Sequence, residues 1–387
     1  MTTTEYRSPW LDADLELYRE TARRFVAQEI TAHQKRFDQQ QHVDRRVWET
    51  AGELGLLLSD IPEEYGGGGG TFAHVAVLLQ ELAAAGDWGF GVGVHQIVAN
   101  YLLHKGTEEQ KRKYLPPMAA GKMIGAIAMT EPGAGSDLQS IATRAELKDG
   151  HYVVRGSKMF ISNGSMADLI VVVAKTNPAA RSKGISLLLL ETRDAKGFQV
   201  GRVLDKLGQK SADTSELFFD DVRVPAANLL GGEEGQGFVQ LMQELPYERT
   251  TCAVSALTAV EAALKMTLDY TRQRKAFGKT LFELQNTRFK LAEIKTQARV
   301  GRSFVDECVQ RVIDGTMDAD TAAMAKLWTT ELLGRAADEC LQLHGGYGYM
   351  LEYPISRLYA DARVQRIYGG ASEIMREIVA RSLERES

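Results

Sequence analysis

The stretch Leu169-Ile-Val-Val-Val-Ala174, followed after ten residues by Ile185-Ser-Leu-Leu-Leu-Leu-Glu191, decides the class of fold. Both runs are apolar and of strand length, and the segment between them contains Asn, Pro, Ser and Gly but no helical pattern. Similar short runs lie at Ile124–Met129, His151–Arg155, Lys158–Ile161 and Glu216–Phe219. Strands without crossover helices predict an antiparallel sheet or small barrel and argue against a Rossmann domain.

Amphipathic helices are predicted before this sheet. The first has Ser8 as N-cap and Pro9 at its first position, and apolar residues then recur at helical spacing as far as Ile30. Further helices are expected at 45–57, 72–84, 91–105 and 107–120. The five glycines at 66–70 must form a loop, because so many glycines cannot cheaply hold a helix or a strand.

Longer helices are predicted after the glycine-rich loop at 231–237. Apolar stripes run from Val254 to Leu268 and from Leu284 to Val305, a third helix is expected at about 318–343, and Pro354 and Ser372 open two shorter ones. The prediction is an α+β fold with an N-terminal α-helical domain (1–123), a central antiparallel β domain (124–236) and a C-terminal four-helix-bundle domain (237–387).

Composition excludes several classes of function. The 387 residues carry a formal net charge of −5, which gives no general attraction to nucleic acid or to anionic membranes. The N-terminus has no signal-peptide pattern, and the longest apolar runs are too short to cross a bilayer, so we expect a cytoplasmic protein. The three cysteines are expected to be free thiols, and the histidines lack ligand spacing, so no metal is predicted.

Five segments carry a resemblance to the acyl-CoA dehydrogenase family, and together they extend over most of the chain. They are Met129-Thr-Glu-Pro-Gly-Ala-Gly-Ser-Asp137, Gly156-Ser-Lys-Met-Phe-Ile-Ser-Asn-Gly164, Gln273-Arg-Lys-Ala-Phe-Gly-Lys279, Gln342-Leu-His-Gly-Gly-Tyr-Gly-Tyr349 and Ile367-Tyr-Gly-Gly-Ala-Ser-Glu-Ile-Met-Arg376. Leu245-Pro-Tyr-Glu-Arg249 combined with Tyr368-Gly-Gly370 is most similar to the long-chain subgroup. The fold that the resemblance implies agrees with the helix, strand and helix pattern above.

The resemblance implies FAD-dependent α,β-dehydrogenation of an acyl-CoA thioester, which needs a carboxylate base at Cα. Most members of the family place that carboxylate where this chain has Gly369. The subgroup that resembles isovaleryl-CoA and long-chain dehydrogenases supplies it from the helix that carries Glu248, which is therefore the predicted base. Two carboxylates facing one carbon would raise each other's pKa, so glycine suits position 369. Glu244, one helical turn earlier, is the rival base by geometry alone.

The resemblance also implies which residues bind FAD. Those expected along the flavin ring are Ile127, Met129, Thr130, Phe160, Ile161 and Ser162. Those expected at the diphosphate and adenine end of an FAD bound mainly by a neighbouring subunit are Arg274, Phe277, Gln285, Gln342, Leu343, His344, Gly345 and Gly346. Ala371, Ser372 and Glu373 complete the predicted set. Phe160 replaces a common tryptophan and Ala371 a common threonine, so the latter change puts one side-chain contact in doubt.

Substrate and partners follow from the same resemblance. The residues expected at the acyl-CoA are Ser136, Tyr247, Arg249, Tyr368, Gly369 and Gly370, with the Gly369 N–H bonded to the thioester oxygen. A long-chain or branched acyl group is expected, carried on CoA or on a carrier protein. The other implied partners are an electron-transferring flavoprotein as acceptor and further copies of the chain in a homotetramer.

Two alternative functions remain open at this point. One is a flavin-dependent oxidase or monooxygenase with the same fold but a different acceptor. The other is a catalytically silent subunit that binds flavin or acyl thioester, which the missing carboxylate at Gly369 suggests. The presence of Glu248 favours α-proton chemistry over both.

Overall fold

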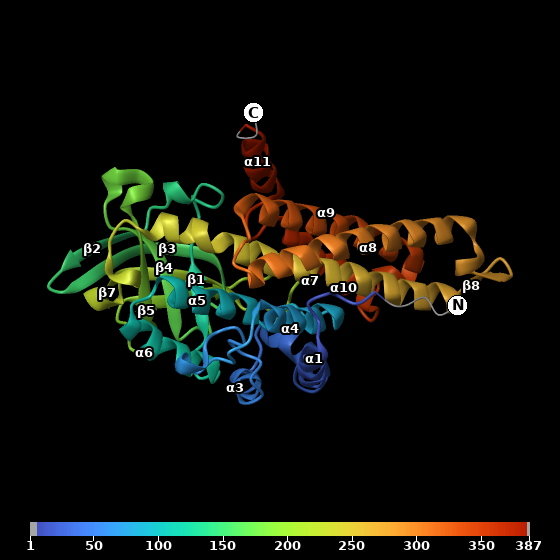
Figure 1. Ribbon diagram of the computed structural model, residues 1–387, viewed down its shortest axis with the longest axis horizontal. Coiled ribbons are helices and arrows are strands. Elements are labelled where there is room, and N and C mark those ends of the chain that lie inside the picture. Colours follow the sequence, from blue (N-terminus) through green and yellow to red (C-terminus); the bar gives the residue numbers. More distant parts are fainter. Residues whose placement is uncertain (1–5, 385–387) are drawn as a thin grey trace.

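The computed structural model describes residues 6–384, in which a β domain and a long helical bundle lie end to end with further helices packed beneath them (Figure 1). The N-terminal helices are α1 (Ala13–Phe25), α2 (Gln34–Gln40), α3 (Arg45–Glu53), α4 (Phe72–Ala84), α5 (Val92–Lys105) and α6 (Glu108–Ala119). The strands of the β domain are β1 (Gly125–Ala128), β2 (Arg144–Lys148), β3 (His151–Ser162), β4 (Leu169–Lys175), β5 (Ile185–Glu191), β6 (Phe198–Val203) and β7 (Thr214–Pro225).

The C-terminal part is helical apart from one small hairpin. Its helices are α7 (Gly237–Gln273), α8 (Gln285–Ile313), α9 (Ala319–His344), α10 (Pro354–Ala362) and α11 (Ser372–Leu383), and the hairpin consists of β8 (Lys275–Ala276) and β9 (Lys279–Thr280). The α+β fold with helical, β and helical regions is therefore confirmed. The domain limits at 123 and 236 stay predictions.

The start of the first helix was predicted wrongly. Helix α1 begins at Ala13, and its N-cap is Asp12, whose carboxylate accepts the N–H of Leu15 at 2.8 Å. Ser8 lies outside the helix, and its hydroxyl donates to Asp306 of α8 at 2.9 Å. Helix α3 also ends earlier than predicted, because the chain turns at Gly55, which has φ +67°.

The sheet is mostly antiparallel, as predicted, but β4 pairs in parallel with β1 and, at Arg144, with β2. Strands follow the order β1-β4-β2-β3-β7-β6, with β5 paired to β4. Strand β1 runs parallel to β4, since β2 and β3 intervene in the chain and return it in the same direction. The two runs predicted at 151–155 and 158–161 form the single strand β3, bent at Gly156. Strands β2 and β6 were missed because they are short and largely exposed.

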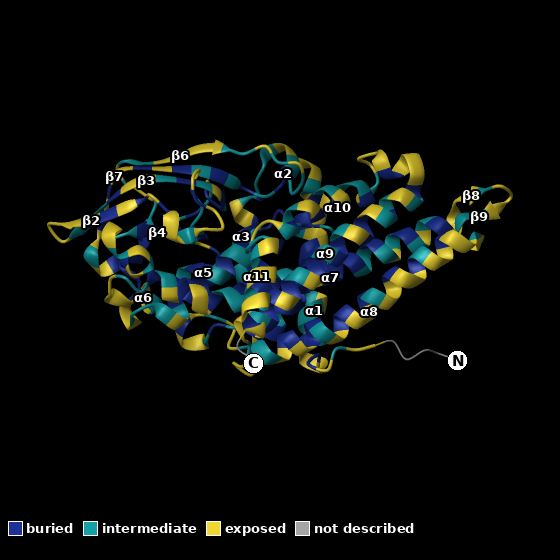
Figure 2. Ribbon diagram, turned by 90° about the horizontal axis from the view of Figure 1, so that it is seen from above, coloured by how far each residue is buried: buried dark blue, intermediate teal, exposed yellow. Residues whose placement is uncertain are grey.

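Strand β4 is apolar from Leu169 to Ala174 because both of its faces are covered there. Leu169, Val171 and Val173 belong to the large core shared with the helices. Ile170, Val172 and Ala174 belong to the separate core inside the curled sheet. Alternate side chains of a strand point to opposite faces, so a strand between two cores has no polar face. Figure 2 shows the resulting buried interior of the β domain.

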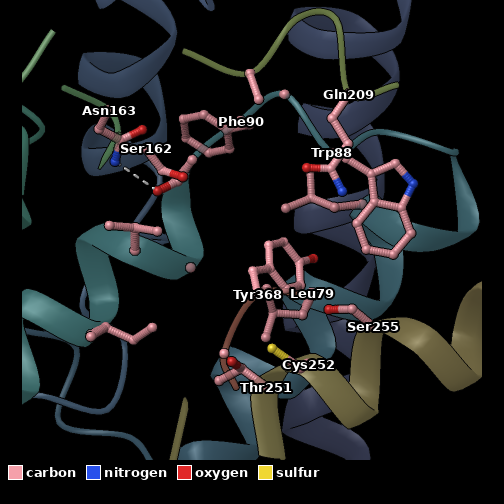
Figure 3. Close-up of a pocket in the computed structure, with 18 of the residues that line it drawn as sticks. Leu79, Trp88, Phe90, Ser162, Asn163, Gln209, Thr251, Cys252, Ser255 and Tyr368 are labelled. Atoms are coloured by element: carbon pink, nitrogen blue, oxygen red, sulfur yellow. Dashed lines mark hydrogen bonds between the residues drawn. The ribbon is translucent and has the colours of Figure 1, made fainter. Parts of the chain in front are cut away.

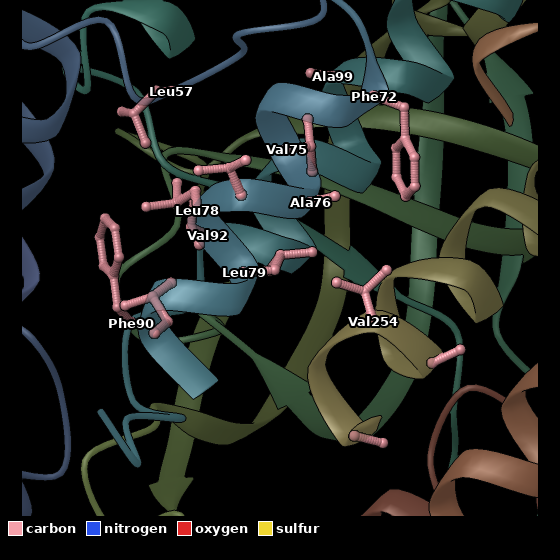
Figure 4. Close-up of a cluster of buried hydrophobic side chains, with 14 of the residues drawn as sticks. Leu57, Phe72, Val75, Ala76, Leu78, Leu79, Phe90, Val92, Ala99 and Val254 are labelled. Atoms are coloured by element: carbon pink, nitrogen blue, oxygen red, sulfur yellow. The ribbon is translucent and has the colours of Figure 1, made fainter. Parts of the chain in front are cut away.

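Helix α7 connects the β domain to the far end of the bundle. Gly237 packs against the backbone of Ser186 on β5, and the helix then contacts α4, α8 and α9 along its length. Helix α4 is buried on most sides, with Leu79 pointing toward Val254 of α7 (Figure 4). This contact brings the N-terminal helices against the segment of α7 that carries Glu248.

Helix α7 is also the one described helix that could cross a membrane by length and composition. An 18-residue window in it has a mean hydropathy of 1.3. The sequence expectation concerned uninterrupted apolar runs, whereas this window has polar residues between its apolar ones. Because 56% of that window is buried inside the protein, the helix fits a core position equally well.

Candidate active site

Glu248 lies on α7 where this helix packs against α5. Its side chain is buried, with the residue 8% exposed, and it lines a cavity of about 250 Å³. The hydroxyl of Tyr101 on α5 donates to Glu248 Oε1 at 3.0 Å. A buried carboxylate that faces a cavity and has one fixed oxygen is a candidate general base.

Burial raises the pKa of Glu248 to about 7. The hydrogen bond from Tyr101 and the nearby Arg249 act in the opposite direction, whereas Glu244 adds to the increase. A base works best when its pKa is close to the working pH, because it is then both ionised and able to accept a proton. Glu248 meets that requirement at neutral pH.

Glu244, the rival base, is engaged elsewhere. Its carboxylate lies 3.0 Å from Nδ1 of His104 and 3.2 Å from Nζ of Lys105, both on α5. It is not among the residues that line the cavity. The geometry therefore favours Glu248 over Glu244.

The cavity is lined by both apolar and polar side chains (Figure 3). Leu79, Leu82 and Ala83 of α4, Trp88 and Phe90 of the following loop, and Val94 and Ile97 of α5 form the apolar wall. Glu248, Thr251, Cys252 and Ser255 of α7, together with Gln209, form much of the polar part. An acyl chain ending in a polar thioester matches this division.

The loop Tyr368–Gly370 closes the cavity beside Cys252. Gly369 has φ +62°, and a Cβ there would lie 3.5 Å from Cys252 Sγ. A side chain at this position would thus meet the Cys252 thiol at ordinary van der Waals distance. Gly370 has φ +95°, and its carbonyl accepts a hydrogen bond from the buried Lys326 of α9 at 2.6 Å. Arg249 is also buried, and its Nε has no hydrogen-bond partner.

The residues predicted along the flavin ring lie at the edge of this cavity and beside it. Ile127 and Ser162 line the cavity, whereas Ile161 is buried in the core of the sheet. Phe160 has φ +61° in a bulge of β3 and leaves its ring 61% exposed.

Met129 and Thr130 are held through their backbone. The Met129 carbonyl accepts a bond from Lys158 Nζ at 3.0 Å, and the Thr130 carbonyl accepts the N–H of Met159 at 2.9 Å. Lys158 is itself fully buried, its Nζ lies 2.8 Å from Glu131 Oε1, and burial lowers its pKa to about 8. This ion pair fixes the chain after β1 against β3.

A second cavity of about 640 Å³ lies at the other end of α7. Its lining includes Arg274, Gln342, Leu343, His344, Gly345 and Gly346, all predicted at the diphosphate and adenine end of FAD. Side chains at Gly345 or Gly346 would meet no atom within 4 Å, so the backbone is open to an incoming ligand. The guanidinium of Arg274 lies 5.4 Å from the ring of Tyr347.

The remaining predicted site residues lie outside the lining of both cavities. Phe277 is 94% exposed in the hairpin, and Gln285 begins α8. Ala371 precedes α11, Ser372 donates to Glu331 at 2.8 Å, and Glu373 pairs with Arg376 at 3.7 Å. The roles predicted for these residues in FAD binding stay predictions.

Two predicted substrate residues also point away from the cavity. Ser136 is exposed in the turn after β1. The Tyr247 hydroxyl donates to Asp60 at 2.9 Å, and its ring packs edge-on against Phe72. Tyr247 thus joins α7 to the N-terminal helices in the described structure.

Sequence reasoning missed Trp88, Tyr101, Gln209 and Lys326. Tyr101 shares a helix face with Val94 and Ile97, and that spacing could have placed it near the cavity. Nothing in the local sequence singles out Lys326, whose role depends on a loop that returns from position 370. The three cysteines are free, as predicted, and Cys252 lines the cavity.

Within residues 6–384 there is no group of three or more His, Cys, Asp or Glu side chains that could hold a metal ion.

We compared the chain with protein-family models, curated proteins and solved structures. Three family models match: acyl-CoA dehydrogenase N-terminal domain over 12–122, middle domain over 126–222 and C-terminal domain over 235–384. The long-chain specific acyl-CoA dehydrogenase of Mus musculus mitochondria is 50% identical over 96% of this chain and 87% of its own length.

Solved structures agree with these matches. The acyl-CoA dehydrogenase of Geobacillus kaustophilus has a TM-score of 0.95 and 45% identity, covering 97% of this chain and all of its own. An acyl-CoA dehydrogenase of Bacillus anthracis, solved in complex with FAD, has a TM-score of 0.91 and 31% identity, covering 98% of this chain and 68% of its own. The chain belongs to the acyl-CoA dehydrogenase family.

Proposed function

We propose that this enzyme uses FAD to oxidise a long-chain or branched acyl-CoA to the trans-2-enoyl-CoA, with Glu248 as the base. The observation that carries the proposal is the buried carboxylate of Glu248 in the lining of a mostly apolar cavity. Its pKa of about 7 lets it accept the α-proton at neutral pH.

The residues present fit FAD. The larger cavity offers a guanidinium from Arg274 and the open backbone of Gly345 and Gly346, which suit a diphosphate. Ile127 and Ser162 border the cavity that contains Glu248 and would hold the flavin ring there. When bound, FAD accepts the hydride that leaves Cβ.

Each protein group then has one task. Glu248 takes the α-proton, and the two electrons of that C–H bond form the new double bond as hydride leaves Cβ. The Gly369 N–H binds the thioester oxygen, where negative charge develops as the α-proton is lost. Lys326 holds the Gly370 carbonyl and so fixes the loop that presents Gly369.

The acyl preference is inferred from two features. The cavity wall of α4, the 88–90 loop and α5 is apolar, which suits a hydrocarbon chain rather than a polar acyl group. The similarity at 50% identity to a long-chain enzyme supports a long chain. The acyl-CoA panel should also include branched substrates. The resemblance to the subgroup that carries its base on this helix implies branched as well as long-chain acyl groups.

The separation of the two cavities supports a homo-oligomer, with a tetramer as the proposed form. Glu248 lines one cavity and Tyr270 the other, and at ~1.5 Å per residue the helix between them is about 33 Å long. We infer that a single FAD bound at one cavity does not reach the other. The two cavities of one chain would therefore serve different FAD molecules, each shared with a second subunit.

The proposed electron acceptor is an electron-transferring flavoprotein, which reoxidises the reduced enzyme. The proposed location is the cytoplasm. The family supports the proposed acceptor, and the cytoplasmic location stays a prediction. An acceptor assay that compares an electron-transferring flavoprotein with O2 separates this proposal from an oxidase or monooxygenase.

The decisive experiment is anaerobic mixing of the purified, FAD-loaded enzyme with straight and branched acyl-CoA thioesters while the flavin absorbance is followed. Wild type should bleach, Glu248→Gln should not, and the matched Glu244→Gln should bleach at close to the wild-type rate. A wild-type enzyme that ignores every thioester would favour the silent-subunit alternative. Loss of bleaching in Glu244→Gln alone would move the base to Glu244.

A further inference from the structure

Tyr101 occupies an unusual position next to the proposed base. It is fully buried on α5, and its hydroxyl donates to Glu248 Oε1 at 3.0 Å. Among the residues described, 6–384, it is the side chain that hydrogen-bonds this carboxylate. Glu248 lines the cavity whereas Tyr101 does not, so the phenol approaches the carboxylate from outside the cavity.

The register between α5 and α7 is fixed by a second set of contacts. His104 and Lys105, three and four residues after Tyr101, meet the carboxylate of Glu244, one turn before Glu248. Consecutive turns of α5 thus bind consecutive acidic turns of α7. The position of the Tyr101 hydroxyl is therefore set by the packing of two helices from different parts of the chain.

We propose that Tyr101 is a positioning residue for the reaction: it holds one oxygen of Glu248, directs the other toward the substrate Cα and stabilises the ionised carboxylate. This inference rests on the proposed function, because it assigns Tyr101 a task only if Glu248 is the base. It adds a residue that the sequence analysis did not select.

The sign of its effect follows from the hydrogen bond. A phenol O–H donates more strongly to an ionised carboxylate than to a neutral one, so this bond lowers the pKa of Glu248. The pKa of Tyr101 is itself raised well above its usual value, mainly by burial, so the phenol keeps its proton. Tyr101 is then a donor throughout the working pH range.

Other charged and titratable groups surround Glu248 and remain when Tyr101 is changed. On α7 these are Arg249, which favours the ionised base, Glu244, which opposes it, and the thiol of Cys252. Asp87 and Asp213 lie in other walls of the cavity. Because these groups are unaltered by a change at Tyr101, a pKa difference between wild type and variant reports the lost hydroxyl.

The test is Tyr101→Phe, which removes only the hydroxyl. Loss of a hydrogen bond to a charged group should raise the pKa of Glu248 by about one pH unit. The rate of anaerobic flavin bleaching at saturating substrate should therefore reach half its maximum about one pH unit higher than in wild type, with a lower plateau and little change in KM. A substrate-free readout is the infrared band of the protonated Glu248 carboxyl, assigned by its absence in Glu248→Gln and titrated with pH.

The matched control is Tyr114→Phe. Tyr114 is also fully buried, and its hydroxyl donates to the carboxylate of Glu191 at 2.9 Å, away from both cavities. This variant should leave both titrations unchanged. Tyr101→Met, whose flexible side chain fills space without a hydroxyl, serves as a second variant if Tyr101→Phe does not fold.

The outcomes separate the two levels of the argument. An upward shift in both titrations for Tyr101→Phe, but not for Tyr114→Phe, supports the inference. Unchanged titrations in a folded, FAD-loaded Tyr101 variant overturn it while leaving Glu248 as the base. Wild-type bleaching by Glu248→Gln would instead overturn the proposed function, and the role of Tyr101 with it.

Discussion

The buried ion pair of Lys158 and Glu131 should be a main stabilising contact between β3 and the chain after β1. Lys158 Nζ lies 2.8 Å from Glu131 Oε1 and 3.0 Å from the Met129 carbonyl, and its side chain is fully buried. Lys158→Met fills a similar volume but leaves the Glu131 carboxylate buried without a cation. Removing one partner of a buried pair costs roughly 3–5 kcal/mol. The N–H groups of Ala142 and Thr143 still bond the carboxylate, so we expect about 3 kcal/mol.

The measurement is thermal unfolding of the FAD-saturated enzyme at pH 7. Lys158→Met should lower the melting temperature by several degrees, and Lys158→Met combined with Glu131→Gln should recover most of the loss, since no charge is then left buried. Lys113→Met is the surface control, because the exposed pair of Lys113 with Glu191 should contribute at most ~1 kcal/mol. A single variant as stable as wild type, or a double variant no better than the single one, would refute the reasoning.

Three further predictions concern a buried histidine and the two cavities. Burial lowers the pKa of His95 to about 4, so between pH 4 and about 6.5 the unfolded chain binds more protons than the folded one. Stability is therefore lost as pH falls through that range, and His95→Gln should flatten the decline in melting temperature. Gly93 lines the acyl cavity with open space around it, so Gly93→Val should shift the preferred acyl-CoA toward shorter chains without changing FAD content. Arg274→Ala should weaken FAD retention during gel filtration by ~10-fold or more, and Arg274→Lys by less, because lysine keeps the charge without the guanidinium fork.

The sequence predicted the elements in which most of the apolar residues are buried. Helix α4 was placed at 72–84, as observed, because its apolar residues are bounded by Thr71 and by the turn at Gly86. Strands β4 and β5 were found because both faces of the strands are buried. By contrast, the exposed strand β6 has few apolar residues facing a core, so its short pattern carries little signal.

The sequence predicted a site residue whose own side chain is the reactive group. It did not predict residues whose role depends on a hydrogen-bond partner far away in the sequence. Glu248 was proposed because the segment around it resembles the long-chain subgroup, and the structure gives it a buried setting. Tyr101 and Lys326 act through partners 147 and 44 positions away, so no local pattern could pair them with Glu248 or Gly370. Ser8 was read as an N-cap for the same reason, because its partner Asp306 is 298 positions away.

The structure also gives a physical reason why the base can stand on α7 when position 369 is glycine. Glu248 and Cys252 are one helical turn apart and line the same cavity, and a Cβ at Gly369 would lie 3.5 Å from Cys252 Sγ. A side chain from position 369 would therefore enter the region that Glu248 already reaches. A second carboxylate there would raise the pKa of Glu248 further above 7 and leave it largely protonated at neutral pH. With φ +62° at Gly369, the loop favours glycine as well, so backbone geometry and charge repulsion both favour a single carboxylate on the helix.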